Sequence, residues 1–258
     1  MQDRYIADEA KVNISSLEAE TVMKSTPVST VTSILGRIGI EYEEGLPKEA
    51  YIAAFKEEFC SEPRWVLLML PKMMLDFLME VWENPVVEMS EERWNYVEYL
   101  KIFGFLAYRM GNSISDEPNQ ILVVDEMKDR FYFLLKSRKS QKALSVYEEW
   151  EKIITGYMYY YGFIETRTLY SLFLKVSKKV VSYEEFILFI KCRSSMWAFG
   201  AILKDFTGKN EYFQYLSVEN ADLLLTYIRE HEELPYKPVK IEDLIYVSDA
   251  AGIDNRWS

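Results

Sequence analysis

Apolar residues recur at helical spacing through most of the chain. Two prolines at first-turn positions, Pro47 and Pro63, open the first two predicted helices, and the second is apolar on most faces, with Pro71 as a possible kink or break. Ser90 then begins S-E-E-R, a helix cap followed by acids in the first turn. In the first half the pattern predicts helices over 47–59, 63–84, 90–103 and 125–135.

Two short apolar runs interrupt this helical pattern. They cover 102–108 and 121–124, and the segment between them is rich in Gly, Asn, Asp, Ser and Pro. Such runs around turn residues predict a β-hairpin with a long tip. The first half therefore consists of three predicted helices, a hairpin and a closing helix.

The same order is predicted again downstream. Helices are expected over 147–161, ending at Gly162, over 165–176 and from Ser182, followed by strand-like runs at 196–203 and 212–216 and a closing helix over 218–229. The segment 90–94 parallels 182–186. We therefore predict a mainly α fold with small β-hairpins, organised as two tandem winged-helix-like units.

The predicted boundaries follow changes in composition. A Ser- and Thr-rich N-terminal segment is expected to be flexible, four basic residues without an acid separate the two units, and a proline-containing connector leads to a short last helix over 241–247. The predicted parts are an arm at 1–33, a first unit at 34–135, a basic linker at 136–146, a second unit at 147–234 and a C-terminal connector with its helix at 235–258.

Charge narrows the range of functions. The 258 residues include 41 Asp and Glu, 30 Lys and Arg, one His and 10 Gly, and the net charge is −11. Scarce glycine and a single imidazole disfavour phosphate loops and general-base chemistry, and no nucleophile or metal-ligand motif is found. We therefore expect a protein without enzymatic activity, cofactor or bound metal.

Two cysteines, Cys60 and Cys192, lie in apolar, helix-like stretches, which favours buried free thiols in a reducing cytosol, although a disulfide is the alternative. The N-terminus lacks the pattern of a signal peptide, and no apolar run is long enough for a membrane span. The expected location is cytoplasmic, without a membrane partner.

A winged-helix-like unit raises the question of nucleic-acid binding. The helices that would enter the major groove begin with Glu91-Glu92 and Glu184-Glu185, where bases and phosphates would require cations or amides. Local basic residues are nevertheless present. The candidate nucleic-acid contacts are Lys136, Arg138, Lys139 and Lys142 in the linker, Lys178 and Lys179 before the third helix of the second unit, and Lys209 in its hairpin.

Tyrosines are abundant, and Tyr157, Tyr159, Tyr160 and Tyr161 form the densest cluster. Because no cation lies between Gly156 and Glu165, a buried aromatic core is favoured over a base-stacking surface. An exposed subset of these rings would instead suit a protein interface.

A weak resemblance to known proteins comes from two segments. The segment 46–52, L-P-K-E-A-Y-I, resembles the helical opening of SAP- and Rho-N-like modules, and 159–186 resembles part of uncharacterised helical Firmicutes proteins, some of which carry a zinc-binding SEC-C motif. That motif is absent here, so no metal is implied. The resemblance implies a helical fold with winged-helix-like segments and no activity.

The sequence therefore predicts a cytosolic interaction or regulatory protein that binds another protein through acidic and aromatic faces. The alternative is a DNA- or RNA-binding transcriptional regulator that uses the local basic patch. An enzyme with an unrecognised pair of carboxylates is the third possibility.

Overall fold

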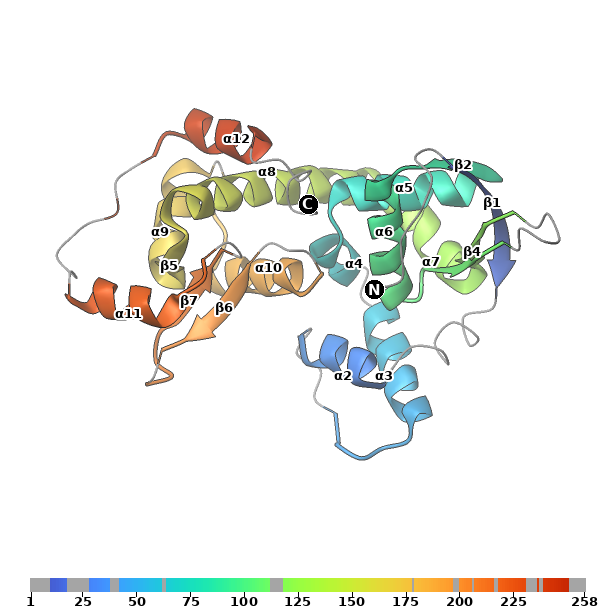
Figure 1. Cartoon of the computed structure of the whole chain (residues 1–258), viewed down its shortest axis with the longest axis horizontal. Coiled ribbons are helices and arrows are strands. Elements are labelled where there is room, and N and C mark those ends of the chain that lie inside the picture. Colours follow the sequence, from blue (N-terminus) through green and yellow to red (C-terminus); the bar gives the residue numbers. More distant parts are fainter. Residues whose placement is uncertain are drawn as a thin grey trace. The chain divides into compact units, whose positions relative to one another are not determined.

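The computed structural model divides into two compact units, residues Met1–Leu144 and Ser145–Ser258, which are each described by themselves (Figure 1). The structure describes residues 10–17, 28–37, 42–61, 64–111, 118–177, 179–196, 200–205, 207–215, 218–230, 236 and 239–250. The described fold is mainly helical with two small sheets, as predicted. Within those ranges, every helix is too short or too polar to cross a lipid bilayer.

Unit 1 consists of helices packed around a sheet, and the predicted helix starts are found. Pro71 has φ −59° and ψ 152°, so it separates α4 from α5, and the Ser90 side chain caps α6 by accepting a hydrogen bond from the Arg93 N–H at 3.3 Å. The described helices are α2 (Val28–Arg37), α3 (Lys48–Ser61), α4 (Arg64–Met69), α5 (Lys72–Glu83), α6 (Glu91–Ile102) and α7 (Asp125–Lys136).

The sheet of unit 1 has the strand order β2-β1-β4-β3. Its strands are β1 (Ala10–Leu17), β2 (Val86–Met89), β3 (Leu106–Arg109) and β4 (Gln120–Val124). Antiparallel pairing of β3 with β4 confirms the predicted hairpin. Strand β3 is shorter than the predicted run 102–108, and β4 begins one residue before the predicted run 121–124. Strand β1 pairs antiparallel with β2 and parallel with β4, so it occupies an interior position of the sheet.

Strand β1 corrects the prediction of a flexible arm over 1–33. Its one fully buried side chain in the described positions is Val12, while Lys11 and Asn13 are exposed. A strand that buries so little apolar surface has a weak sequence pattern. Its stability comes from ladders with partners more than 70 residues away, which local periodicity does not reveal.

The segment predicted as a basic linker, 136–146, is helical apart from Ser137, and the boundary between the two units, after Leu144, lies within it. Helix α7 ends at Lys136, and α8 (Arg138–Tyr161) begins after Ser137 alone. Ser137 Oγ accepts a hydrogen bond from the Ser140 N–H at 3.2 Å, which caps the new helix. The chain therefore turns sharply at one residue, and the cations lie at the end of one helix and the start of the next.

Among the described residues, unit 2 contains the rest of α8, four further helices and a second sheet. Gly162 ends α8 with φ +66°, a left-handed conformation that glycine adopts without strain, and its N–H reaches the Met158 carbonyl at 2.8 Å. The elements that follow are β5 (Phe163–Glu165), α9 (Thr166–Val176), α10 (Tyr183–Met196), β6 (Ala201–Lys204), β7 (Glu211–Gln214), α11 (Ala221–Glu230) and α12 (Ile241–Ala250). The strand order is β5-β7-β6, entirely antiparallel.

The two units do not match element by element. One helix, α6, lies between β2 and β3, whereas two helices, α9 and α10, lie between β5 and β6. Unit 1 also inserts β1 between β2 and β4, in a position that has no counterpart in the three-stranded sheet. The sequence parallel between 90–94 and 182–186 therefore reflects shared helix caps, because Ser182 Oγ accepts from the Glu185 N–H at 3.1 Å as Ser90 does from Arg93.

Aromatic side chains form much of the core of unit 2. The Trp150 ring lies edge-on to Phe173 and Phe189, with centroid distances of 5.6 and 5.5 Å, and Phe173 packs on Phe186 at 5.0 Å. These rings join α8, α9 and α10 into one layer. The helix α12 packs on α8 through Leu244, which is fully buried.

Candidate functional site

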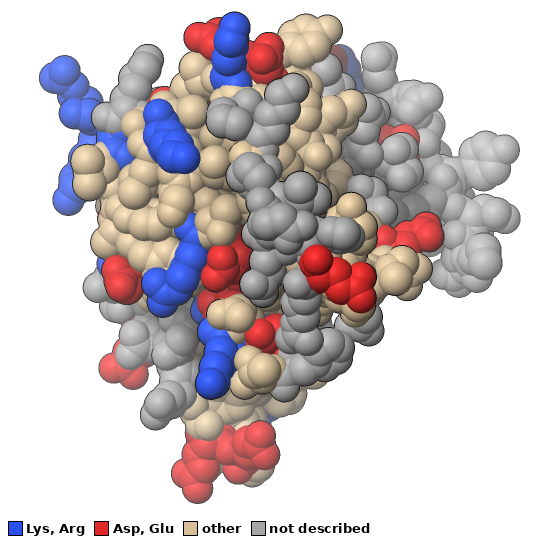
Figure 2. Space-filling model, turned by 90° about the vertical axis from the view of Figure 1, so that its left-hand side faces the viewer, with Lys and Arg blue, Asp and Glu red and all other residues tan. Residues whose placement is uncertain are grey.

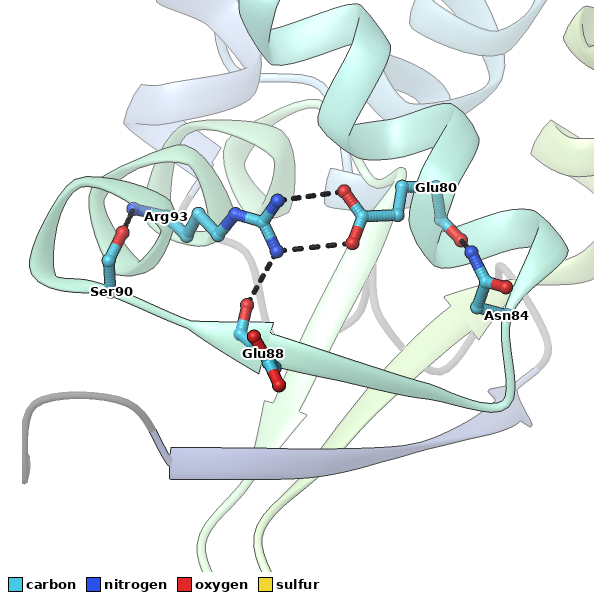
Figure 3. Close-up of polar contacts among 5 residues, drawn as sticks. All are labelled: Glu80, Asn84, Glu88, Ser90 and Arg93. Carbon is cyan, nitrogen blue, oxygen red and sulfur yellow. Dashed lines mark hydrogen bonds and ion pairs between the residues drawn. The ribbon is translucent and has the colours of Figure 1, made fainter.

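A hollow of about 520 Å³ lies in unit 1, where α5 ends, β2 passes and α6 begins (Figure 3). This volume is within the range of pockets that hold small molecules or inserted side chains. Its lining residues are Glu80, Asn84, Val86, Glu88, Met89, Ser90 and Arg93.

A bidentate ion pair crosses this hollow. Arg93 donates from its two terminal nitrogens to the two Glu80 carboxylate oxygens at 3.1 and 2.8 Å, and one of those nitrogens also donates to the Glu88 carbonyl at 2.6 Å (Figure 3). The two side chains are about one third exposed. The pair joins α5, β2 and α6, and the guanidinium is neutralised within the protein.

Strand β2 is an edge of its sheet, and the ladder register shows which of its groups face outward. Ile14 N–H donates to the Pro85 carbonyl at 2.8 Å, which shows that Pro85 faces β1. Because successive residues of an antiparallel pair alternate, the main-chain N–H and C=O groups of Val86 and Glu88 point away from β1. The Glu88 carbonyl is covered by Arg93, while the Val86 carbonyl remains on the open edge. Acceptors from Asn84, Val86 and Glu88 therefore surround the hollow.

Exposed acids lie at the starts of α6 and α10, as predicted. Glu91, Glu184 and Glu185 are exposed, whereas Glu92 is half-buried and accepts a hydrogen bond from Tyr96. Carboxylates in a first turn are favoured by the helix dipole, so they stabilise these helices whether or not a partner binds.

The predicted basic linker residues separate into two environments. Lys136 pairs with Glu83 and donates to Tyr132 Oη at 2.7 Å, and this hydrogen bonding to Glu83 raises the pKa of Lys136 above its ordinary value. Arg138, Lys139 and Lys142 are exposed and form no ion pair with the described residues. They lie in the first turns of α8, where the helix dipole opposes positive charge.

In unit 2, the described candidate cations lie in different segments. Lys179 is exposed in the segment between α9 and α10, Lys209 is exposed in the β6–β7 turn, and Lys178 lies outside the described residues. In the face of the molecule that Figure 2 presents, Lys and Arg alternate with Asp and Glu and do not form one continuous basic surface. Sequence reasoning could not anticipate which lysines share a local site, because that depends on the hairpin geometry.

The tyrosine cluster is divided between core and surface. Tyr157 is buried and donates to the Leu172 carbonyl at 3.1 Å, and burial raises the pKa of Tyr157 to about 12. Tyr159 and Tyr160 are exposed and lie edge-on to each other. The predicted aromatic core therefore includes Tyr157. The exposed tyrosines of the cluster are Tyr159 and Tyr160.

Groups that could support other chemistry are few in the part of the chain that the structure covers. No set of three or more His, Cys, Asp or Glu side chains is arranged there to hold a metal ion. The Cys192 side chain is buried, and the His231 and Cys60 side chains lie outside the described groups. Gly208 and Lys209 belong to a strand-turn-strand hairpin, so they do not form the strand-to-helix loop of a nucleotide site.

The β6–β7 turn is organised by one carboxylate. Asp205 accepts hydrogen bonds from the Thr207 N–H and hydroxyl at 3.0 and 2.7 Å, from the Lys209 N–H at 3.2 Å and from the Asn210 side-chain amide at 3.1 Å. These bonds, that of the Thr207 hydroxyl foremost, lower the pKa of Asp205 below its ordinary value. The ionised carboxylate therefore holds Thr207, Lys209 and Asn210 in place.

We expect this turn to loosen in acid. Because the pKa of Asp205 is lowered by folding, its stabilising effect is complete above its ordinary pKa of 3.8 and is lost as the pH falls below that value toward the folded pKa. Hydrogen exchange of the Thr207 and Lys209 amides should accelerate beyond the intrinsic pH effect in that acid window and not between pH 7 and pH 5. The Asp205→Asn variant should lack this transition, and the exposed Asp243→Asn variant should keep it. A transition that persists in Asp205→Asn would assign it to another group.

Comparison with known proteins identified no protein-family model, no curated protein and no solved structure that matches this chain.

Proposed function

We propose that this is a non-enzymatic, cytosolic interaction protein that binds another protein through acidic and aromatic surfaces. The observation that best supports this proposal is that carboxylates are exposed at the starts of α6 and α10. They favour a basic surface on a partner protein and repel a phosphate backbone.

A winged-helix unit over 145–230 is part of this proposal. The order of helix, strand, two helices, hairpin and helix supports it, as does the antiparallel strand order β5-β7-β6. In such a unit α10 would be the reading helix. Its exposed Glu184 and Glu185 favour contact with a protein over contact with DNA.

The hollow beside β2 supports the same class of partner. Glu80 neutralises Arg93, and the remaining acceptors include the Val86 carbonyl and the Glu88 carboxylate, which lies 3.9 Å from Lys11 Nζ on β1. An inserted lysine or arginine side chain could donate to these groups. The exposed rings of Tyr159 and Tyr160 provide the kind of amphipathic surface that protein interfaces favour.

Charge reversal tests this proposal. The full chain and its Glu91→Lys/Glu184→Lys/Glu185→Lys variant are each cross-linked in host lysate, and partners are identified by mass spectrometry. We expect a reproducible protein partner for the unchanged chain and a loss of about tenfold or more in its recovery with the variant, since rim charges steer association. A variant with Glu148→Lys, Glu126→Lys and Asp129→Lys, carrying the same change in charge at other sites, should retain the partner.

The alternative function is nucleic-acid binding through Arg138, Lys139 and Lys142, which are exposed and oppose the dipole of α8. Tight binding of the unchanged chain to duplex DNA at physiological salt, with no protein partner recovered, would contradict the proposal and favour this alternative. Replacing the three cations by Ala should then reduce the salt dependence by about one unit of slope per lost phosphate contact.

A further inference from the structure

A smaller cavity in unit 2, of about 180 Å³, lies between the β6–β7 turn and the starts of α9 and α10. Its volume corresponds to roughly six water molecules in the liquid, at about 30 Å³ each, which suits one phosphate group with its nearest waters. The lining residues are Glu165, Thr166, Arg167, Tyr183, Lys204, Gly208, Lys209, Asn210 and Glu211.

Three cations from separate segments converge on this cavity. Arg167 is in the first turn of α9, Lys204 ends β6, and Lys209 lies in the turn between β6 and β7. All three are exposed at the cavity rim, and none forms an ion pair with a carboxylate among the described residues. Three neighbouring like charges repel one another, and a bound anion would remove that repulsion.

The surroundings of these cations are held in place. The Arg167 guanidinium lies over the Tyr183 ring, 4.9 Å from its centroid, and Tyr183 Oη is 2.7 Å from Thr166 Oγ1. Asp205 accepts from the Lys209 N–H and from the Asn210 side-chain amide, and these bonds support the turn that carries Lys209. A preorganised site loses little entropy when it binds.

The two carboxylates of the cavity are already engaged. Glu165 accepts a hydrogen bond from Thr168 Oγ1 at 2.9 Å, and Glu211 lies 3.7 Å from Lys191 Nζ. Lys191 therefore offsets Glu211. The three rim cations outnumber the two remaining carboxylates, Glu165 in the lining and Asp205 in the turn, so the site keeps a small positive excess. This positive excess is confined to one small site in an acidic protein.

We propose that this cavity binds a phosphate monoester carried on the partner protein, that is, a phosphorylated serine or threonine side chain. This inference rests on the proposed protein-binding function and adds the chemical group that the partner presents. A phosphate monoester carries about −1.5 to −2 charges at pH 7 and three acceptor oxygens, which match three converging cations.

A single phosphate fits the surroundings better than a nucleic-acid backbone. Glu184 and Glu185 follow Tyr183 directly and are exposed, so a polyanion extending from the cavity along α10 would meet carboxylates. A lone phosphate on a peptide meets only the cavity. The same acids would attract basic residues next to the phosphorylated side chain in the partner.

The test uses the full chain labelled with ¹⁵N and a mixture of short random peptides that share one central phosphoserine. We expect this mixture to shift the backbone amide signals of Lys209 and Asn210, and an otherwise identical mixture with serine to leave them unchanged. Lys204→Gln/Lys209→Gln should weaken binding by about tenfold or more, since charge-assisted hydrogen bonds are lost. Arg138→Gln/Lys139→Gln, which removes two exposed cations elsewhere, should bind as the unchanged chain does.

Other outcomes would overturn the inference in distinguishable ways. Equal binding of both peptide mixtures would show that the site does not recognise the phosphate, and the proposed protein-binding function would still stand. Inorganic phosphate that binds as tightly as the phosphopeptides would identify a site for a free anion. Duplex DNA that shifts the same signals at physiological salt, in the absence of peptide binding, would contradict both proposals. If the Arg138→Gln/Lys139→Gln control weakened phosphopeptide binding as much as Lys204→Gln/Lys209→Gln does, the loss of binding would reflect the overall charge of the protein and not this cavity.

Discussion

Replacing Glu151 by leucine is expected to destabilise unit 2 by about 3–5 kcal/mol. Glu151 on α8 and Arg193 on α10 are both buried, with side-chain exposures of 7% and 1%, and Arg193 Nε lies 3.4 Å from Glu151 Oε2. Removing the carboxylate takes from the buried Arg193 guanidinium the negative charge that lies 3.4 Å from its Nε. The free energy of unfolding, measured by urea denaturation, should fall by that amount.

The double variant Glu151→Leu/Arg193→Met separates the buried charge from the packing. Because both charges are then absent, we expect it to recover most of the stability that the single variant loses. Glu148 is exposed on the same helix, so Glu148→Leu should change the unfolding free energy by less than about 0.5 kcal/mol. A loss below about 1 kcal/mol for Glu151→Leu would show that the pair contributes little to folding.

Replacing Gly156 by alanine is expected to displace α12 from α8. A Cβ atom at this position would lie 2.5 Å from the Leu244 carbonyl oxygen and 2.7 Å from its Cα, and main-chain atoms cannot swing aside as a side chain does. Leu244 is fully buried, so separating the helices would expose it at a cost of about 1.5–3 kcal/mol. Alanine also improves the helix propensity of α8 by about 1 kcal/mol, which offsets part of the loss.

Hydrogen exchange measures this effect locally. The amides of α12 should exchange faster in Gly156→Ala, while those of the β5-β7-β6 sheet remain protected. Gly36 on α2 provides the matched control, because its added Cβ would meet no atom within 4 Å, and Gly36→Ala should leave stability unchanged or raise it. Unaltered protection of α12 in Gly156→Ala would mean that this helix adjusts to the added methyl group.

Local signals predicted the helical elements well. Ser90 and Ser182 cap α6 and α10, Pro71 separates α4 from α5, and Gly162 ends α8. Each of these signals acts within one turn of helix, so the sequence pattern alone contains the information. The elements that depend on distant partners were harder to predict. Strands β1, β2 and β5 were missed because each pairs with a strand far away in the chain.

The candidate sites also combine residues that the sequence indicates with groupings that only the fold creates. Lys209 could be named from sequence, but its grouping with Arg167 and Lys204 depends on the hairpin turning back toward α9. Lys136 was predicted as a nucleic-acid contact, yet it pairs with Glu83, which precedes it by more than 50 residues. The hollow beside β2 had no signal in the sequence, since Glu80 and Arg93 are ordinary surface residues until α5 and α6 meet.

The sequence by itself determined the mainly helical class, the helix caps and the acidic starts of α6 and α10, because these depend on residues within a few positions of one another. Only the tertiary structure decided that β1 enters the sheet, that the basic segment is helical and that Arg193 and Glu151 are buried together. It also decided which cations face one cavity. The physical reason is that strand ladders, buried ion pairs and convergent charges join residues distant in the chain, and their energies appear only when the fold brings those residues into contact.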